Sequence, residues 1–477
     1  MGVLYFFQDI LSQPAILIAL IALIGLLMQK RAATDVIKGS LKSLLGFLII
    51  GAGAGVIVGA LEPMGAMFEK AFNVSGVVPN NEAIIALALQ EFGDTTAWIM
   101  FFGMIANLLL ARLTRLKYVF LTGHHTLYMA CMLAVIILTV GFQGWIVIAI
   151  GAVALGLTMI LFPAMGQDTM KRVVGTDEVA IGHFSTISYW GAGVVGKLIG
   201  KGSKSTEEIN FPKTLAFFRD SSLAIGITMS VIYIVLAIIA GADFVQSQLS
   251  GGLNFIVFAL IQGMTFAAGV FIVLQGVRMI IAEIVPAFKG ISERLIPGSK
   301  PALDCPVVFP YAPNAVLIGF FSSFVAGVIG MFILGIVGGI VILPGVVPHF
   351  FVGATAGVFG NARGGIRGTI FGSFVNGLLL TFAPLALLPL LGELGFANTT
   401  FSDLDFIAAG IVVGGAGSIA QWLVPVLVFG LAGLLIIFNF ILPKKGLATE
   451  AEEAPEAADN AETTEAAEAT DNAETKE

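Results

Sequence analysis

The sequence predicts an all-α polytopic membrane protein with about eleven transmembrane helices, two inverted repeats and re-entrant hairpins. Its mean hydropathy is +0.97, and 57% of its residues are hydrophobic while 12% are charged. Soluble domains carry roughly 25% charged residues, so this composition excludes the soluble class. Many apolar runs reach the length of about 18 residues that a membrane-spanning helix needs. Their continuity favours helices over barrel strands, which alternate in roughly ten-residue pieces.

The loops between the apolar segments alternate between many and few basic residues. Basic residues are frequent after odd-numbered spans and rare after even-numbered ones, and basic loops stay in the cytoplasm. With eleven spans, this pattern places the N-terminus outside and the C-terminus in the cytoplasm. The expected spans cover about 14–28, 44–61, 95–111, 120–140, 145–165, 222–242, 253–275 and 315–343, then a short ninth before Arg363, a tenth ending near Leu391 and an eleventh ending before Lys444.

The last residues differ sharply in composition from the rest. Thr449–Glu477 holds eleven Asp and Glu against one Lys, a charge of −10, so the remainder of the chain is about +3 although the whole is −7. Such an Ala-, Glu- and Thr-rich segment cannot bury a core. We expect a disordered cytoplasmic tail at 446–477 after a permease domain at 1–445, with a helical interaction tail as the alternative.

Two segments, 82–91 and 179–200, are too short or too polar to span a membrane and too apolar to be loops. We expect re-entrant hairpins there, which are tolerated at membrane depth only where protein or a cavity buries them. An internal repeat agrees with this, because Asp304 falls 222 residues after Glu82 and Gly345 falls 222 after Gly123. Five spans separate the paired elements, so repeats at about 44–210 and 253–420 would be inverted. Chance similarity among Ala-, Gly- and Val-rich helices is the alternative.

Polar residues at membrane depth are the candidate site. Ionisable groups there are costly unless they face the bundle interior or water. His124 and Tyr128 share one helical face, and His183 lies in the second expected hairpin. Asp304 opens a Pro-rich stretch that cannot be regular helix, and Asn81–Glu82 holds the equivalent place in the first half. The candidate substrate-binding residues are His124, His183, Asp304, Tyr128, Glu82 and Asn81.

Structural roles are the alternative for several of these residues. His125 and His349 are more typical of interfacial anchors near helix starts, and Asp304 could cap a helix. The two cysteines, Cys131 and Cys305, give neither a disulfide framework nor a metal-ligand spacing. We therefore expect no metal and no cofactor.

Several motifs resemble a known family. They are L-T-G-H at Leu121, I-G-H at Ile181, Q-G-V-R-M at Gln275, F-K-G-I-S-E-R-L-I-P-G at Phe288, D-C at Asp304, A-P-N-A-V at Ala312 and G-V-F at Gly357. Over about residues 1–445 the chain resembles the membrane-embedded IIC component of the ascorbate-specific phosphotransferase system (PTS). The F-K-G-I-S-E-R-L-I-P-G match is long and specific.

This resemblance implies a permease in the bacterial inner membrane that takes up L-ascorbate or a related sugar or polyol. It implies a homodimer in the lipid bilayer, with a core domain that carries the sugar against a scaffold domain. A separate phosphocysteine-bearing IIB protein, supplied by IIA, would phosphorylate the substrate at the inner face. This chain would then not be the enzyme, and nothing suggests a nucleic-acid partner.

The resemblance carries over directly to three ligand positions, His124, His183 and Asp304. The chain departs from the family pattern at Tyr128 and Phe184, where the family has Gln, and at Asn81–Glu82, where it has Thr-Tyr. These departures concern the substrate. A proton- or sodium-coupled secondary transporter that uses Glu82 and Asp304 remains the alternative function; a channel or a membrane-embedded enzyme lacks a filter motif or an activated nucleophile.

Overall fold

The computed structural model describes residues 10, 14–72, 77–79, 81–209, 221–294, 296–338, 340–392 and 399–441. The expected acidic tail at 446–477 lies outside these residues, and so does the side chain of Glu82, whose backbone is helical. The chain divides into two units, Met1–Ile436 and Ile437–Glu477. Of the described residues, only 437–441 belong to the second unit.

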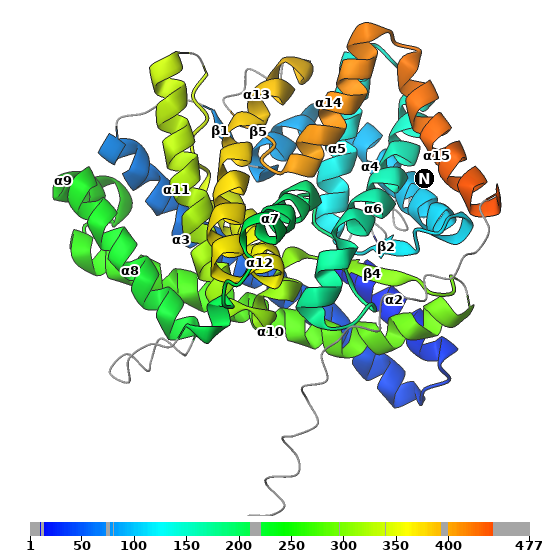
Figure 1. Cartoon of the computed structure of the whole chain (residues 1–477), viewed down its shortest axis with the longest axis horizontal. Coiled ribbons are helices and arrows are strands. Elements are labelled where there is room, and N and C mark those ends of the chain that lie inside the picture. Colours follow the sequence, from blue (N-terminus) through cyan, green and yellow to red (C-terminus); the bar gives the residue numbers. More distant parts are fainter. Residues whose placement is uncertain are drawn as a thin grey trace, which may run out of the picture. The chain divides into compact units, whose positions relative to one another are not determined.

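Helices dominate the described chain (Figure 1), so the expected all-α polytopic class is confirmed. The helices are α2 (Pro14–Met28), α3 (Ala33–Phe72), α4 (Asn81–Leu113), α5 (Gly123–Thr139), α6 (Trp145–Val174), α7 (Thr186–Ile199), α8 (Ser221–Ala240), α9 (Ala242–Phe244), α10 (Phe255–Arg294), α11 (Pro313–Val337), α12 (Val346–Phe382), α13 (Pro384–Leu387), α14 (Leu404–Ile419) and α15 (Leu423–Ile441). Short turns of other helix types are η1 (Thr206–Glu208), η3 (Val245–Leu249), η4 (Cys305–Tyr311) and η5 (Leu388–Leu390).

Span lengths differ from those expected. Within the described ranges, six helices are long and apolar enough to cross a membrane, or seven if a bent pair at 229–249 counts as one span. The expected ninth and tenth spans are the two arms of α12, which turn back along each other at Gly364 and Gly365, so that Ser373 Oγ donates to the carbonyl of Gly353. The expected eleventh span corresponds to α15, and α14 is a further, shorter apolar helix. The count of eleven spans therefore stays a prediction.

Two long helices are broken at boundaries that the sequence indicated, the end of the segment 82–91 and the end of the expected ninth span. Helix α4 leaves helical geometry at Phe92, with φ −115° and ψ 16°, so 81–91 forms a short arm. Helix α12 breaks at Gly364 and Gly365, and Gly365 has φ 55°. This backbone conformation is essentially restricted to glycine, and a Cβ at Gly365 would overlap the carbonyl oxygen of Lys204. The segment 179–200 is a short strand, a bend and α7.

Very short parallel strands connect distant parts of the chain. Strands β2 (Tyr118–Phe120) and β3 (Ala180–Ile181) pair with the two sides of β4 (Lys300–Leu303). A second sheet joins β1 (Val78–Pro79) to β5 (Thr399–Thr400). Each strand is followed closely along the chain by a polar or ionisable side chain.

The elements of the two expected repeats correspond in order. Helices α3 and α10 are both 40 residues long, and they begin 222 residues apart. Strand β1 continues on one side into a bridge between Val77 and Ile342 and pairs on its other side with β5. Ile342 lies 222 residues after Phe120 of β2, so this arrangement matches that of β4, which lies between β2 and β3. This agreement supports a repeat, while its inversion in the membrane stays a prediction.

Glycine brings the helices around the small sheets close together. A Cβ at Gly319 of α11 would meet the backbone of Gly353 and Gly357 in α12, and one at Gly196 of α7 would meet the backbone of Gly360. Small residues of this kind allow close approach of helices in a membrane. Helix α12 therefore packs tightly between α11 and α7 (Figure 1).

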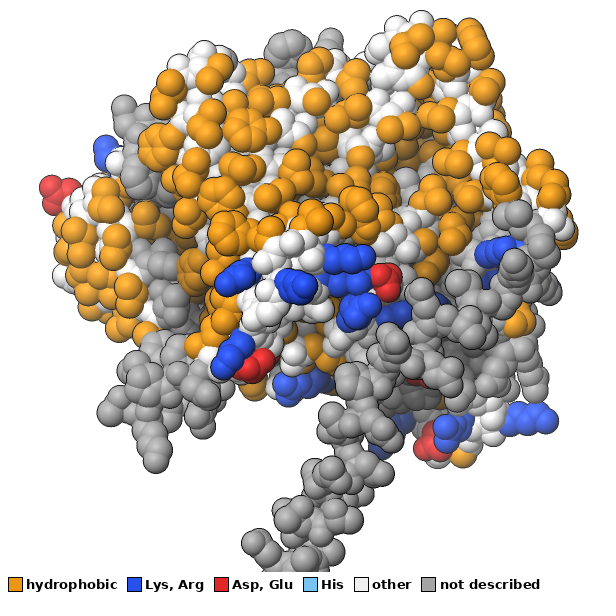
Figure 2. Space-filling model, viewed as in Figure 1, with side chains coloured by type: hydrophobic (Ala, Val, Ile, Leu, Met, Phe, Trp, Pro, Cys, Tyr) orange, Lys and Arg blue, Asp and Glu red, His pale blue; other side chains and the backbone are white. Residues whose placement is uncertain are grey.

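The surface separates into an apolar part and a basic margin. Figure 2 shows hydrophobic side chains over most of the drawn face and Lys and Arg gathered in its lower part. The segment expected in the cytoplasm supplies exposed basic residues at the ends of α6 and α7: Lys171, Arg172, Lys197, Lys201 and Lys204. This distribution agrees with the expected multi-pass membrane protein.

Candidate functional site

The first small sheet collects three of the predicted residues. Its strands run in one direction, so the residues that follow them emerge at a common edge. His124 follows β2 at the start of α5, His183 follows β3, and Asp304 follows β4. Residues from three separate parts of the sequence thereby become neighbours.

Asp304 joins the two histidines. Its Oδ1 lies 2.9 Å from Nδ1 of His183, and its Oδ2 lies 3.5 Å from Nε2 of His124. The backbone N–H of Cys305 also donates to Oδ1, at 2.7 Å, so Asp304 caps η4 as well as contacting the histidines. The side chain of His124 is 39% exposed and that of Asp304 20%, whereas His183 is 6% exposed. His124 is therefore the most accessible of the three.

The second small sheet supplies a facing wall. Asn81 follows β1, and Ser402 and Asp403 follow β5. Asn81 Nδ2 donates to Asp403 Oδ2 at 3.1 Å, and Asn81 Oδ1 accepts from the N–H of Ser402 at 3.0 Å. Asp403 Oδ2 lies 3.7 Å from Nε2 of His183. His183 thus stands between two carboxylates, one from each sheet.

Asp405 connects the segment that carries His183 with the segment that carries Asp403. This fully buried carboxylate accepts from the backbone N–H groups of Thr186 at 2.8 Å and Ile187 at 2.9 Å. Both groups belong to the first turn of α7, whose N–H groups have no partner within the helix. The N–H of Asp405 in turn donates to the carbonyl of Phe184 at 3.1 Å. The bend that carries His183 is therefore tied to the start of α14.

Aromatic rings close one side of this polar cluster. The ring of buried His125 lies 3.8 Å from that of His183, centre to centre, and is nearly parallel to Phe406 at 5.6 Å. Tyr128 lies 5.9 Å from His124, which agrees with their expected common face. Phe184 stacks on Phe120 of β2 at 4.6 Å.

The structure thus brings together five of the six predicted site residues. His124, His183, Asp304, Tyr128 and Asn81 lie in or beside one cluster; the side chain of Glu82 lies outside the described residues. That these groups bind substrate stays a prediction.

The two histidines given structural roles lie apart from each other. His125, expected to be structural, lies inside the cluster. His349, expected as an interfacial anchor, is instead buried and hydrogen-bonded through Nδ1 to Ser323 Oγ at 2.8 Å. Because His349 belongs to α12 and Ser323 to α11, this bond holds the two helices together.

Two residues near the cluster were missed by sequence reasoning. Asp403 and Asp405 stand just before and within the first turn of the apolar helix α14, where the pattern indicates the edge of a span. The only available signal was their charge at the start of an apolar run.

Some of these groups have metal-ligand chemistry. The three sets found among the described residues are His124, His125 and Asp304; His125, His183 and Asp403; and His183, Asp304 and Cys305. Two imidazoles that share one tetrahedral ion at 2.0–2.1 Å hold their ring centres roughly 5 Å apart. The 3.8 Å between His125 and His183 is too close for that, and Nδ1 of His183 is already bonded to Asp304. This argument applies to the two sets that contain His183, whereas the rings of His124 and His125 are 4.7 Å apart, close to the spacing for a shared ion.

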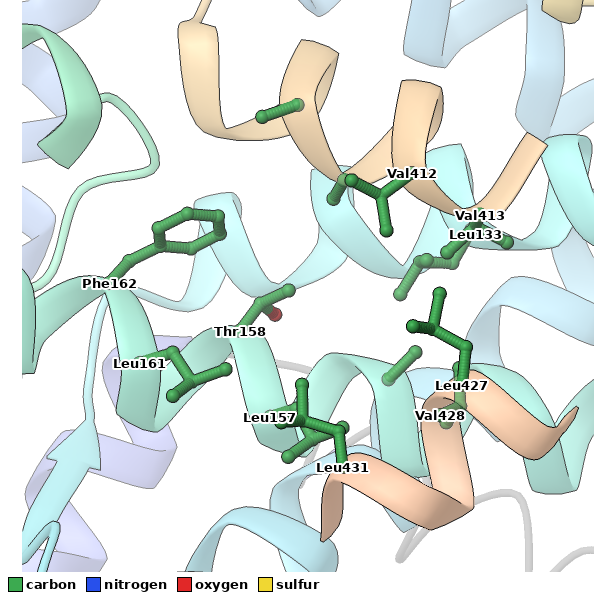
Figure 3. Close-up of a pocket in the computed structure, with 13 residues that line it drawn as sticks. Leu133, Leu157, Thr158, Leu161, Phe162, Val412, Val413, Leu427, Val428 and Leu431 are labelled. Atoms are coloured by element: carbon green, nitrogen blue, oxygen red, sulfur yellow. The ribbon is translucent and has the colours of Figure 1, made fainter. Parts of the chain in front are cut away.

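An apolar cavity lies elsewhere in the bundle. It has a volume of about 260 Å³, is partly open, and is lined by α5, α6, α14 and α15 (Figure 3). Leu133, Leu157, Phe162 and Val412 are typical of its lining, and its one hydroxyl, on Thr158, donates to a backbone carbonyl. A ligand rich in hydroxyl groups would lose its hydrogen bonds there, so this cavity suits an apolar ligand better than a polar one.

An ion-pair cluster lies at the end of α6 and in the segment that follows it. Asp177, between α6 and β3, contacts Lys300 Nζ at 2.5 Å, Lys171 Nζ at 2.9 Å and Gln167 Nε2 at 2.8 Å. Partial burial opposes its ionisation, but these hydrogen bonds outweigh burial and hold the pKa of the Asp177 carboxyl below its usual value. The cluster joins β4 to α6 near the base of the site.

Comparison with known proteins adds a family. The family model described as EIIC-GAT, PTS system sugar-specific permease component, matches residues 9–405. The chain is also 27% identical over 434 residues to the "Ascorbate-specific PTS system EIIC component" of Mycoplasma pneumoniae. That similarity covers 78% of this chain and 64% of the relative, so the chain spans just under two thirds of the relative's length. Because the family model covers most of it, this chain belongs to the EIIC-GAT family of PTS sugar-specific permease components.

Proposed function

We propose that this protein is the membrane permease of a sugar phosphotransferase system and that it takes up L-ascorbate or a related sugar or polyol. The observation that carries the proposal is the position of His183 between Asp304 and Asp403, inside a bundle of apolar helices. Buried charged groups in membrane helices are retained where they serve a substrate path. The relative named for ascorbate supports this choice of substrate class.

The chemistry of the cluster fits a hydroxylated ligand. Imidazoles and the amide of Asn81 donate hydrogen bonds, and the carboxylates of Asp304 and Asp403 accept them. A ligand with several hydroxyl groups can therefore exchange its water shell for protein groups. If the ligand is ascorbate, which is an anion near neutral pH, the histidines offset the two carboxylates; a neutral polyol needs no such compensation.

The remaining parts of the proposal concern assembly and topology. A separate IIB protein, recharged by IIA, phosphorylates the sugar at the inner face, so this chain supplies transport and not the phosphoryl group. Eleven spans place the N-terminus outside and the C-terminus in the cytoplasm of a bacterial inner membrane. Two inverted repeats, at about 44–210 and 253–420, form one subunit of a homodimer. The acidic segment at 446–477 follows the permease as a cytoplasmic tail.

Ligand-induced stabilisation tests the site. The purified protein is heated with L-ascorbate, with sorbitol as a neutral polyol, and without ligand, and the same series is run on His124→Ala. A ligand that binds only the folded state raises Tm, by an amount that grows with the logarithm of its concentration once this exceeds Kd. We expect one probe to raise the Tm of the wild type and to do so much less in the variant. Equal stabilisation of both proteins would place the ligand elsewhere.

A further inference from the structure

We propose that Asp403 is a positioning residue of this site, which holds the His183 ring as a hydrogen-bond donor toward the bound sugar. This role rests on the proposed function, because it assigns a residue to the same site. Neither the motifs nor the family resemblance pointed to Asp403.

The carboxylate of Asp403 is fixed within the protein. Its side chain is only 3% exposed, and burial of an ionised carboxylate is costly unless it is hydrogen-bonded. Ser402 Oγ donates to its Oδ1 at 3.1 Å, and Asn81 Nδ2 donates to its Oδ2 at 3.1 Å. One of its partners is therefore itself a predicted substrate-binding residue.

The ring of His183 has one satisfied nitrogen and one unsatisfied nitrogen. Nδ1 contacts Asp304 Oδ1 at 2.9 Å, and because an ionised carboxylate only accepts, Nδ1 donates this bond. Nε2 is buried without a hydrogen-bond partner. It lies 3.7 Å from Asp403 Oδ2, which is longer than a hydrogen bond.

This geometry gives Asp403 an effect on what His183 offers. A negative charge 3.7 Å from Nε2 favours a proton on that nitrogen over a bare lone pair. With Asp304 on one nitrogen and Asp403 near the other, the ring is held in one plane with an unused N–H. An oxygen of a bound sugar can accept that hydrogen bond. Asp403 thus acts on the ligand through His183.

An Asn substitution separates this role from simple packing. Asp403→Asn keeps the size of the side chain, and its amide oxygen can accept from Asn81 while its amide nitrogen donates to the hydroxyl of Ser402, which is also an acceptor. The substitution removes the charge that faces His183. Ser402→Ala is a milder change, which removes only the hydroxyl bonded to Asp403. Asp243→Asn removes an exposed carboxylate in α9 and serves as the matched control.

The experiment measures Kd and Tm on the full-length protein in detergent, with L-ascorbate and sorbitol as probes. For the probe that the wild type binds, Asp403→Asn should raise Kd about tenfold, the loss of one charge-assisted hydrogen bond, with little change in Tm. Asp403→Glu should recover part of that affinity, which a purely structural role would not predict. The control should bind as the wild type does.

The outcomes separate the two proposals. Asp403→Asn with wild-type Kd, or Asp403→Glu that binds no better than Asp403→Asn, would overturn the role of Asp403 and leave the proposed function intact. A wild type that binds neither probe would overturn the proposed function and this role with it. If Asp403→Asn does not fold, Ser402→Ala decides: about threefold weaker binding at unchanged Tm is expected, and wild-type Kd overturns the role.

Discussion

Replacing Asp304 by Asn should weaken substrate binding strongly, because this carboxylate joins both histidines. Asp304→Asn keeps the shape of the side chain and an oxygen that can accept from Cys305, at 2.7 Å in the wild type. It removes the charge that faces His183 at 2.9 Å and His124 at 3.5 Å. Cys305 and His183 both donate to Oδ1, so an Asn oxygen in this place keeps both bonds without their charge and turns the amide nitrogen, which is a donor, toward His124.

The size of the effect can be worked out from these contacts. A hydrogen bond to a charged group contributes about 1.5–3 kcal/mol, and about 1.4 kcal/mol corresponds to a tenfold change in Kd. Because the His124 contact is long and 39% exposed, only the bond to His183 is counted. A neutral hydrogen bond contributes about 0.5–1.5 kcal/mol, so loss of the charge alone should raise Kd roughly tenfold. Unfolding should also become easier, by up to about 3 kcal/mol.

Isothermal titration of the purified protein with L-ascorbate and with sorbitol measures this change, and thermal unfolding shows whether the variant is folded. Asp177→Asn is the matched control, because it removes a carboxylate of the ion-pair cluster at the end of α6. The control should bind with the Kd of the wild type. A folded Asp304→Asn protein with a Kd within about twofold of the wild type would refute the assignment of Asp304 to the site.

Two further predictions concern stability. The pKa of Asp177 is lowered in the folded protein, so its ion pairs stabilise the protein above the unfolded-state pKa of about 3.9. This contribution is about 1 kcal/mol or less for a partly exposed pair. It is lost as the pH falls through the lower folded-state pKa. Thermal unfolding between neutral and acidic pH should therefore show a smaller acid loss of Tm in Asp177→Asn than in the wild type, and identical pH curves would contradict this. Gly365→Ala should destabilise by about 1–3 kcal/mol or more, because Ala is strained at its φ of 55° and its Cβ overlaps Lys204. Gly191→Ala in α7, where a Cβ meets no atom within 4 Å, is the control, and an equal Tm for the two variants would count against the described break in α12.

The sequence predicted the membrane class and the residues that follow the first small sheet, and the structure places these residues as expected on physical grounds. His124, His183 and Asp304 are polar groups in apolar surroundings, and the cost of burying them marks them as candidates. Their contacts with one another depend on β2, β3 and β4. These strands have two to four residues, too few for any periodicity to reveal.

The second wall shows where local reasoning stops. Asn81 and Asp403 bond to each other across 322 positions of sequence, and strand β5, which brings Asp403 there, is two residues long. His125 was expected to be an interfacial anchor because it stands near the start of a helix and, unlike His124, does not match the family pattern. The neighbour on its own face, His183, comes from another segment, and helical periodicity carries no information about it.

Helix boundaries were the least predictable part of the fold. The two arms of α12 correspond to two expected spans, and the chain reverses between them at Gly364 and Gly365, which brings Gly360 against the backbone of Gly368. Conversely, Ala420 in an extended conformation separates α14 from α15 within one apolar run. Hydropathy reports the burial of a segment, and it does not register a change of direction inside one.

Uptake into sealed vesicles is the most direct test of the proposed group translocation. Vesicles that carry this protein are supplied with labelled L-ascorbate on the outside, with or without the IIB and IIA proteins and their phosphate donor inside. The account predicts that label accumulates inside as the phosphorylated sugar only when the phosphate donor and both partner proteins are present. Full accumulation of unmodified ascorbate driven by a proton or sodium gradient alone would contradict it and would favour an ion-coupled transporter.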